Sequence, residues 1–304
     1  MTIAVWSGAL EQGLLWAVMV LGVYLTFRVL DFPDLTIDGG FTLGAAVVTR
    51  FIIEGLNPLW GMIAAMFCGA AAGLVTGFLH TRLKIAPLLA GILTMIALYS
   101  INLRVMGSAN LSLLRMETAL TWIMNLGFNK ACSAIILGAI AVIIVVIILY
   151  LFLNTEMGMA IRATGDNEQM IRTLGVNTDT MKIVGLSMGN ALVALSGSMV
   201  AQYQGFADVG MGIGMIIMGL AAVIIGEALV GAKSLLRALI AVVIGSIIYR
   251  LVISVVLQIG LPTTDLKLFT AVIVTVALAF PVIKDSFRTK QMMRRVGNVE
   301  DTKG

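Results

Sequence analysis

Charged side chains are scarce in this sequence, where Asp, Glu, Lys and Arg make up 12% of 304 residues. A soluble domain carries about 25% charged and about 45–50% apolar residues, whereas 60% of this chain is hydrophobic. Too little polar surface remains to face water, so the composition excludes an ordinary soluble domain. Segments 55–79, 131–155 and 183–207 contain no charged residue. Because about 20 apolar residues span a bilayer as a helix, and lipid leaves no partner for unpaired backbone groups, these runs predict membrane-spanning helices.

Cysteine and histidine are nearly absent, which removes most options for metal binding and acid–base catalysis. Cys68 and Cys132 lie in or beside apolar segments, and we interpret them as small hydrophobic residues rather than a disulfide or metal site. The single histidine, His80, has no His, Cys or carboxylate at ligand spacing. Residues 185–189 match the letters of a G-x-S-x-G nucleophile elbow, but that motif needs a strand-to-helix turn and a histidine base. We predict no catalytic residue, no metal site and no enzymatic activity.

A nucleotide-binding loop is missing as well. Residues 226–234 come nearest to one, but Ala232 separates Gly231 from Lys233, so the G-x-x-x-x-G-K-[ST] spacing fails. We therefore expect no cofactor on this chain, and any energy for transport must come from a partner or an ion gradient. The net charge of +4 does not indicate a nucleic-acid ligand, because a membrane explains where the charges lie.

The apolar segments predict an all-α, polytopic membrane protein with a single domain over residues 1–304. The first segment lacks a basic region and a cleavage site, and we interpret it as a first span rather than a removable signal. The second span is the weakest, because Asp34, Asp38 and Arg50 crowd its ends. Residues 107–130 predict an interfacial helix or a short re-entrant piece. The nine expected spans are 9–29, 36–53, 58–79, 86–106, 131–153, 182–204, 212–230, 236–258 and 267–284.

The distribution of basic residues predicts how the chain is oriented in the membrane. With the N-terminus outside, 14 of the 20 Lys and Arg residues fall on the inner side and five on the outer side, while Arg250 lies within a span. Inner loops of membrane proteins carry the excess of Lys and Arg. We therefore expect the N-terminus outside and a basic C-terminal tail, 285–304, inside.

A weak internal repeat accompanies this topology. Asp34 and Asp208 each open a Gly-rich segment, and a Leu-Lys pair precedes both the span at 86–106 and the span at 267–284. Under the predicted topology the members of each pair cross the membrane in opposite directions. Two inverted units, 9–106 and 182–284, are therefore expected, and such units commonly place a transport path along their pseudo-symmetry axis.

The large inner loop, 154–181, contains a short capped helix. Asp166 has the side chain to cap a helix that begins near Asn167, and Gly175 supplies a left-handed stop. A helix of about two turns is too short to be stable alone. From the residues alone two interpretations stay open: the helix lies on headgroups or its own bundle, or it couples to a cytoplasmic partner. Its apolar residues share one face at helical spacing: Met170, Ile171 and Leu174.

A family resemblance favours the second interpretation. The run G-M-A-I-R-A-T-G-D-N at 158–167, then L-G-V-N at 174–177, then Lys182 and a Ser-Gly pair at 196–197, resembles permeases of branched-chain amino acid and ribose-type ABC importers. The Gly-rich entry at 34–40, Tyr249-Arg250 and Asp265-Leu266-Lys267-Leu268 also fit that family. The chain departs from ribose-type members, which carry an extra first span.

The resemblance implies a permease of the cytoplasmic (inner) membrane that works with cytoplasmic ATPase subunits. ATP and magnesium would bind those subunits, an extracytoplasmic solute-binding protein would deliver the solute, and a second permease copy, giving a homodimer, would complete the path. The inner loop would then hold the coupling residues. These are Arg162, Asp166, Asn167, Glu168, Met170, Ile171, Arg172, Leu174 and Gly175.

Polar residues within spans are candidates for the translocation path, because burying them in lipid is costly. Asp38 with its two glycines is expected to break the second span, and Arg250 either snorkels or bonds to a neighbouring span's carbonyls, or pairs with Glu227 or Asp38. The hydroxyl and amide residues either line the path or join helices. The candidates are Asp38, Gly39, Gly40, Thr94, Asn102, Ser187, Asn190, Glu227 and Arg250.

The alternative hypothesis is a stand-alone secondary transporter or channel coupled to an ion gradient. It requires an ion-coupling carboxylate deep in a span, for which Asp38 and Glu227 are the candidates. Small apolar residues line most spans, and no ring of like charges indicates an ion pore. The resemblance favours amino acids, branched-chain or aromatic, as the solute.

Overall fold

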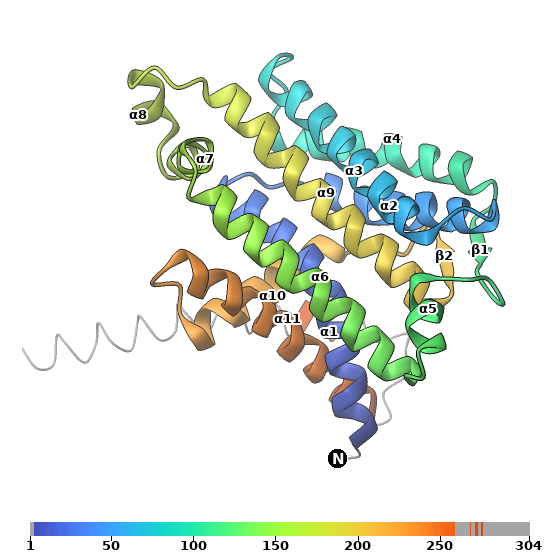
Figure 1. Ribbon diagram of the computed structural model, residues 1–304. Helices are drawn as coiled ribbons and strands as arrows, with labels where there is room; N and C mark the ends of the chain where they lie inside the picture. The colour runs from blue at the N-terminus through green and yellow to red at the C-terminus, as the bar shows by residue number, and fades with distance from the viewer. Residues whose placement is uncertain (1–2, 259–267, 269–270, 273–274, 276–304) are drawn as a thin grey trace, which may run out of the picture.

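The computed structural model describes residues 3–258 together with 268, 271, 272 and 275 (Figure 1). Its elements follow in the order α1 (Ile3–Val23), η1 (Tyr24–Val29, a π-helical continuation of α1), α2 (Thr36–Ile53), α3 (Pro58–Thr81), α4 (Pro87–Met106), β1 (Asn110–Ser112), α5 (Ala119–Asn125), α6 (Lys130–Leu153), α7 (Glu156–Asp166), α8 (Glu168–Thr173), α9 (Thr178–Gln204), β2 (Phe206–Asp208), α10 (Met215–Val230) and α11 (Leu235–Gln258).

The chain is an all-α, multi-pass membrane protein. Among the described residues, seven helices are long and apolar enough to cross a membrane, and they match seven of the predicted spans. The predicted span at 212–230 corresponds to the shorter helix α10, which begins three residues later because the loop before it ends in left-handed Gly214. Most of the predicted ninth span, the end of the second repeat unit and the basic tail lie outside the described residues.

Local signals in the sequence explain where several helices begin and end. Pro58 and Pro87 occupy the first positions of α3 and α4, where their missing N–H groups would be unpaired in any case. Asn57 caps α3 by accepting a hydrogen bond from the Leu59 N–H (2.9 Å). Gly107 and Gly205 end α4 and α9 in the left-handed conformation that glycine adopts without strain.

Three helices form the centre of the bundle, and the others surround them. The spans α1–η1, α2 and α9 are mostly buried, whereas α3, α4, α6 and α11 expose most of their surface. A seam of glycines on α3 lies against α9: Gly69, Gly73 and Gly77 all face α9 so closely that a Cβ would meet its residues Asn190, Leu186 and Ile183. Small residues let two membrane helices approach in this way, so α3 and α9 form a tightly packed pair.

Residues 107–130 form a strand and a short helix rather than a helix or re-entrant piece alone. Strand β1 pairs antiparallel with β2, with Asn110 opposite Asp208. The strand arises because the backbone after α9 offers β1 a partner 94 to 98 residues away in sequence, which local patterns do not reveal. Helix α5 follows, and its N-terminus carries a capping box between Thr118 and Thr121.

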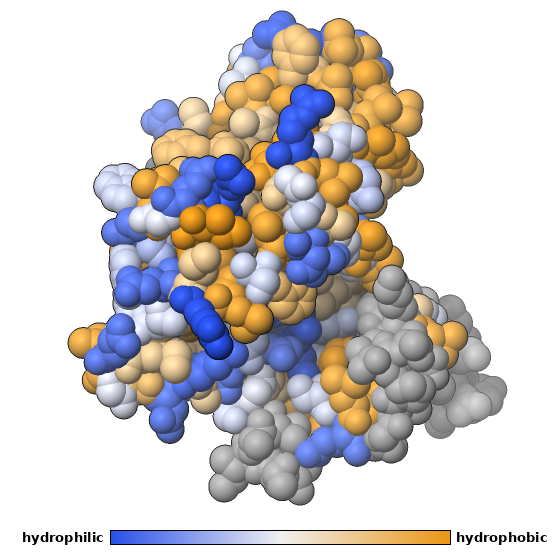
Figure 2. All heavy atoms as spheres, turned by 90° about the vertical axis from the view of Figure 1, so that its right-hand side faces the viewer, coloured by the Kyte–Doolittle hydropathy of each residue, from blue (hydrophilic) through white to orange (hydrophobic). Residues whose placement is uncertain are grey.

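The connecting segments gather at two opposite ends of the bundle. Strands β1 and β2 and helix α5 lie at one end, and α7, α8 and the α3–α4 turn lie at the other (Figure 1). Figure 2 views the end that carries β1, where polar residues mix with a broad hydrophobic area. Exposed aliphatic side chains also run along α6 and α4, as expected of surfaces that face lipid or another membrane subunit.

Candidate functional site

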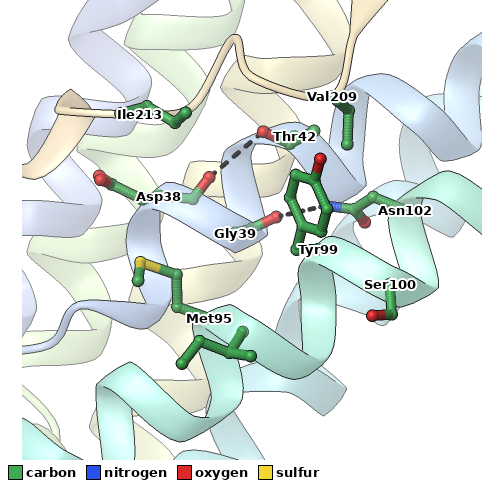
Figure 3. A pocket seen from close by; sticks show the side chains of 10 residues that line it. Asp38, Gly39, Thr42, Met95, Tyr99, Ser100, Asn102, Val209 and Ile213 are labelled. Carbon is green, nitrogen blue, oxygen red and sulfur yellow. Dashed lines mark hydrogen bonds between the residues drawn. The ribbon is translucent and has the colours of Figure 1, made fainter. Parts of the chain in front are cut away.

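A groove of about 350 Å³ lies between α2, α4 and the loop that precedes α10 (Figure 3). It brings together three of the predicted path residues, namely Asp38, Gly39 and Asn102. A mostly apolar wall with a few polar groups is typical of sites for small organic molecules. The remaining lining residues are Thr42, Met95, Ile96, Tyr99, Ser100, Val209 and Ile213.

Asp38 joins two walls of the groove. Its Oδ2 accepts a hydrogen bond from the Gly214 N–H (2.8 Å), and its Oδ1 accepts one from the Ile216 N–H (3.0 Å). Helix α10 has no capping side chain of its own, because its N-terminal position is Gly214. A carboxylate satisfies the unpaired N–H groups of a helix start and complements its dipole. Asp38 is therefore the cap of α10, supplied by α2.

The glycines after Asp38 do not break the second span, contrary to our prediction. Helix α2 runs without interruption from Thr36 to Ile53. A Cβ on Gly39 would lie 2.9 Å from the Leu98 side chain, and one on Gly40 would lie 3.0 Å from Asn190 Oδ1. These positions thus serve close packing of α2 against α4 and α9. Glycine tolerates a helical conformation, and neighbouring helices compensate for its low propensity.

Asn102 and Tyr99 shape the side of the groove that α4 contributes. Asn102 Nδ2 donates a hydrogen bond to the Gly39 carbonyl (3.1 Å), which ties α4 to α2. The Oδ1 of Asn102 is buried and has no hydrogen-bond partner among the described residues. The Tyr99 side chain is half exposed and its ring lies beside this bond in Figure 3. Helix α4 therefore carries a buried, unpaired amide oxygen one turn away from the half-exposed Tyr99 ring.

Thr94 and Asn190 lie inside the bundle and not along the groove, so the structure places them where helices join. Thr94 Oγ1 accepts a hydrogen bond from Thr76 Oγ1 (3.0 Å), and Thr76 in turn lies 2.6 Å from Thr36 Oγ1. Asn190 Nδ2 donates to the buried carboxylate of Asp34 (2.6 Å). These bonds connect α2, α3, α4 and α9. The Ser187 hydroxyl is buried and finds no partner in the described part of the chain.

Glu227 pairs with Arg28 rather than with Arg250. The Arg28 Nε lies 3.1 Å from Glu227 Oε1, and the pair borders a second cavity of about 350 Å³ between η1 and α10. The Arg28 side chain is 59% exposed, so the pair contributes little to stability. The alternative in which Glu227 pairs with Arg250 is therefore wrong: Glu227 lies near the short turn that joins α10 to α11, whereas Arg250 lies in the second half of α11.

Among the described residues, Arg250 packs on α1 and not on Asp38 or Glu227, the two carboxylates considered as its partners. Its guanidinium carbon lies 3.8 Å from the centre of the Trp16 ring, and its Nη1 donates to Gln12 Oε1 (3.4 Å). An arginine stacked on tryptophan gains a cation–π interaction that is stronger when water is excluded. Nearby, the Tyr203 hydroxyl donates to buried Glu11 (3.0 Å). This polar cluster joins α1, α9 and α11 away from the groove.

The predicted coupling segment consists of two helices instead of one. Asp166 is the last residue of α7 and does not cap the next helix, contrary to our prediction. Asn167 is the cap of α8, and its Oδ1 accepts from the Met170 N–H (3.0 Å). The register shifts because 156–166 already form a helix capped by Thr155, so the break falls one residue later. Gly175 adopts the expected left-handed conformation.

The apolar residues of α8 point in two directions. Ile171 is buried, whereas Met170 is 52% and Leu174 is 70% exposed. The three do not share one face, since Ile171 turns toward the bundle and the other two turn away from it. Met157 and Met159 on α7 are also exposed, and Arg162 and Asp166 are exposed beside them. The segment thus presents an apolar pair and flanking methionines at one end of the molecule.

Ionic contacts hold α8 against the start of α9. The Arg172 guanidinium donates to Glu168 Oε1 (2.9 Å), to Asp179 Oδ1 (3.0 Å) and, from its Nε, to Thr178 Oγ1 (2.7 Å). Glu168 Oε2 also accepts from Lys182 Nζ (2.8 Å). Burial would raise the pKa of Glu168, but the hydrogen bond and charge of Lys182 and the charge of Arg172 outweigh it and lower this pKa. Glu168 and Arg172 are thereby engaged within the chain.

Sequence reasoning missed several residues that the structure brings to these regions. Tyr99 and Thr42 line the groove, and His80 contacts the loop through Lys182. Tyr99 is three residues before Asn102, so helical spacing from that candidate could have identified it. His80 lies 102 residues from Lys182, and no local pattern connects them.

A family model described as the permease component of the branched-chain amino acid transport system matches residues 6–279. The chain belongs to this family. It is 43% identical over 270 residues to the tyrosine transport system permease protein of Clostridioides difficile (strain R20291), with 89% of each chain covered.

More distant relatives extend the same picture. An uncharacterized protein of Rickettsia prowazekii, RP368, is 35% identical, with 89% of this chain and 95% of the relative covered. The autoinducer 2 import system permease protein LsrC of Yersinia pseudotuberculosis is 28% identical, with 81% and 69% covered. No solved structure gave a significant match. This permease is therefore a membrane component of a transport system.

Proposed function

We propose that this permease is the membrane subunit of an ATP-driven, binding-protein-dependent importer of amino acids. Cytoplasmic ATPase subunits that hold ATP and magnesium would supply the energy, and an extracytoplasmic binding protein would deliver the solute. The permease would lie in the cytoplasmic membrane with nine spans, its N-terminus outside and its C-terminus inside. Family membership and the relative named as a tyrosine permease support an aromatic or branched-chain amino acid as the solute.

The exposed apolar pair on α8 is the observation that carries the ATPase assignment. Met170 and Leu174 project from a capped, ionically anchored helix at the end of the molecule that also holds the α3–α4 turn. Neither residue lies within a predicted span, so the bilayer core does not account for their exposure. An aliphatic pair on a helix one turn apart fits a hydrophobic groove on a partner. The partner would be the ATPase, because residues of this segment carry the family resemblance.

The groove between α2 and α4 supports the path assignment. Tyr99 and Ile96 are exposed on the α4 side of the groove, which is therefore open along that flank. A second permease copy packed beside α4 would close the groove into a path between two chains. Its few polar groups, Asp38, Asn102 and Ser100, would meet the charged ends of a zwitterionic solute.

The experiment compares two charge substitutions at opposite ends of the molecule. The permease is co-expressed with its candidate ATPase and purified as Met170→Asp/Leu174→Asp or as the matched control Met124→Asp/Leu126→Asp on α5 and just after it. Met124 and Leu126 have comparable exposure, 38% and 77%. We expect the α8 variant to lose ATPase from the purified complex and to lose uptake of radiolabelled tyrosine and leucine. Normal ATPase association in the α8 variant would overturn the assignment.

The second candidate is a stand-alone transporter, which requires an ion-coupling carboxylate deep in a span. Asp38 is engaged as the α10 cap, and Glu227 pairs with Arg28, so neither named carboxylate lies unpaired in a span. Proteoliposomes that contain only the permease would decide between the two. Uptake driven by a sodium or proton gradient, with no ATPase present, would favour the secondary transporter.

A further inference from the structure

Lys182 occupies a junction between three parts of the chain. It lies in the second turn of α9, and its side chain is 14% exposed. Its ammonium donates to Glu168 Oε2 on α8 (2.8 Å) and faces His80 Nε2 at the end of α3 (3.4 Å). A nearly buried ammonium needs such partners, because an unpaired charge would be costly to remove from water. Lys182 thus bridges α8 and α3.

The geometry assigns the proton on His80. His80 Nδ1 lies 2.9 Å from the carbonyl oxygen of Ile85, and a carbonyl only accepts hydrogen bonds. Nδ1 therefore carries the hydrogen, and in the neutral ring Nε2 presents a lone pair to the Lys182 ammonium. Phe32 packs edge-on against the imidazole, with ring centres 5.2 Å apart. His80 consequently links Lys182 to the α3–α4 turn.

This turn leads directly into the helix that forms one wall of the groove. Ile85 precedes Pro87, the first residue of α4, and α4 carries Tyr99 and Asn102. On the other side of the turn, Lys84 lies 3.8 Å from Asp179. The glycine seam already packs α3 against α9. Contacts therefore run without a gap from α8, through Lys182 and His80, to the start of α4.

Lys182 is not required to hold α8 in place. Arg172 binds Glu168 on its own helix, and it also binds Asp179 and Thr178 at the start of α9. These contacts secure α8 to α9 without any help from Lys182. Among the described contacts, Lys182 is the residue that connects α8 and the start of α9 to His80. Its contribution is therefore the connection to the α3–α4 turn.

We propose that Lys182 is a positioning residue that clamps the coupling helix α8 to the α3–α4 turn, so that displacement of α8 reaches α4 and the groove. The inference rests on the proposed function, since it presumes that an ATPase moves α8. Through the clamp, a movement of α8 would be transmitted to the end of α3 and the start of α4, and so to the groove. Without it, α4 would follow α8 and α9 only through side-chain packing and the exposed Lys84–Asp179 pair.

The test measures the groove while the ATPase changes state. In the assembled complex, with Cys68 and Cys132 replaced by Ala, a single Ser100→Cys reports the reactivity of the groove toward a maleimide. Its labelling rate is measured without nucleotide and after trapping with ATP and vanadate. We expect the rate to change at least about fivefold, the lower end of usual coupling between sites, when Lys182 is present. In Lys182→Met the two rates should become nearly equal.

Matched variants separate the clamp from general damage. Lys182→Arg keeps a cationic donor and should retain most of the change, and His80→Gln should retain part of it because its amide oxygen can accept from Lys182. Lys84→Met removes an ammonium that is 71% exposed and should have little effect. A full rate change in Lys182→Met would overturn the clamp, and so would no change in the Lys182-containing complex. If the ATPase does not associate with the Lys182-containing permease at all, that result would instead contradict the proposed function.

Discussion

Asp38 illustrates how a single polar residue in a membrane helix acts on a distant element. Its charge near the start of the second span made it a candidate for a broken helix or an ion site. The structure uses both carboxylate oxygens as acceptors for the N–H groups of α10, 176 and 178 residues away in sequence. A residue with that role determines where the groove loop, 209–214, lies relative to α2. Its contribution is therefore to geometry before any contact with a solute.

Removing this cap should destabilise α10. In Asp38→Ala the N–H groups of Gly214 and Ile216 lose their acceptors, and loss of a cap costs about 0.5–2 kcal/mol. We expect a lower thermal midpoint in detergent and faster hydrogen exchange at the first turn of α10. Asp166→Ala is the control, because it removes the same group from an exposed position at the end of α7. Unchanged exchange at residues 214–218 would show that the cap is dispensable.

At the scale of elements, α3 packs closely on α9 because the α3 residues at the contact are glycines, which have no side chain. Gly73 approaches the backbone of Leu186 and Ser187, and a Cβ there would collide with the Leu186 carbonyl. Backbone atoms cannot move aside as a flexible side chain can. The seam therefore fixes the spacing of two helices that both reach the coupling segment.

Adding one methyl group tests this seam. Gly73→Ala should force α3 and α9 apart and lower the free energy of unfolding by about 1–3 kcal/mol, as overpacking does. Gly8→Ala in α1 is the control, because a Cβ there would meet nothing within 4 Å. Alanine also favours helix over glycine by up to about 1 kcal/mol, so Gly8→Ala should be neutral or stabilising. Equal thermal midpoints for the two variants would contradict the role of the seam.

At the scale of the whole molecule, the two ends of the bundle differ in what they present. One end carries the β1–β2 ribbon and α5, and the other carries α7, α8 and the α3–α4 turn. The distribution of Lys and Arg predicts that the α8 end faces the cytoplasm. Under the proposed function, a binding protein and an ATPase would then act on opposite ends of the bundle.

Cysteine labelling in whole cells checks this orientation. In a Cys68→Ala/Cys132→Ala background, Leu126→Cys should react with a membrane-impermeant maleimide added to intact cells. Met170→Cys should react only in inverted vesicles, because the predicted topology places α8 on the inner side. Both side chains are well exposed, 77% and 52%, so burial does not limit either reaction. Labelling of Met170→Cys in intact cells would contradict the predicted orientation and, with it, the proposal that α8 contacts a cytoplasmic ATPase.

Local sequence patterns could be interpreted without the tertiary structure. Apolar segments located seven spanning helices among the described residues, and Gly175 marked a helix end. The family resemblance also followed from contiguous motifs, and the family match confirms it. Predictions from local sequence failed where a neighbouring element changed the result. Because α7 continues to Asp166, the cap of α8 is Asn167 and not Asp166.

Hydropathy and spacing by themselves determined that this protein is a bundle of membrane helices, because lipid excludes unpaired backbone and permits few alternatives. Only the tertiary structure decided which polar side chains meet. Asp38 finds α10, Arg250 finds Trp16, and Lys182 joins Glu168 to His80 across segments that are far apart in sequence. Such pairs form because a buried polar group must find a partner in space, and sequence distance places no limit on where that partner comes from.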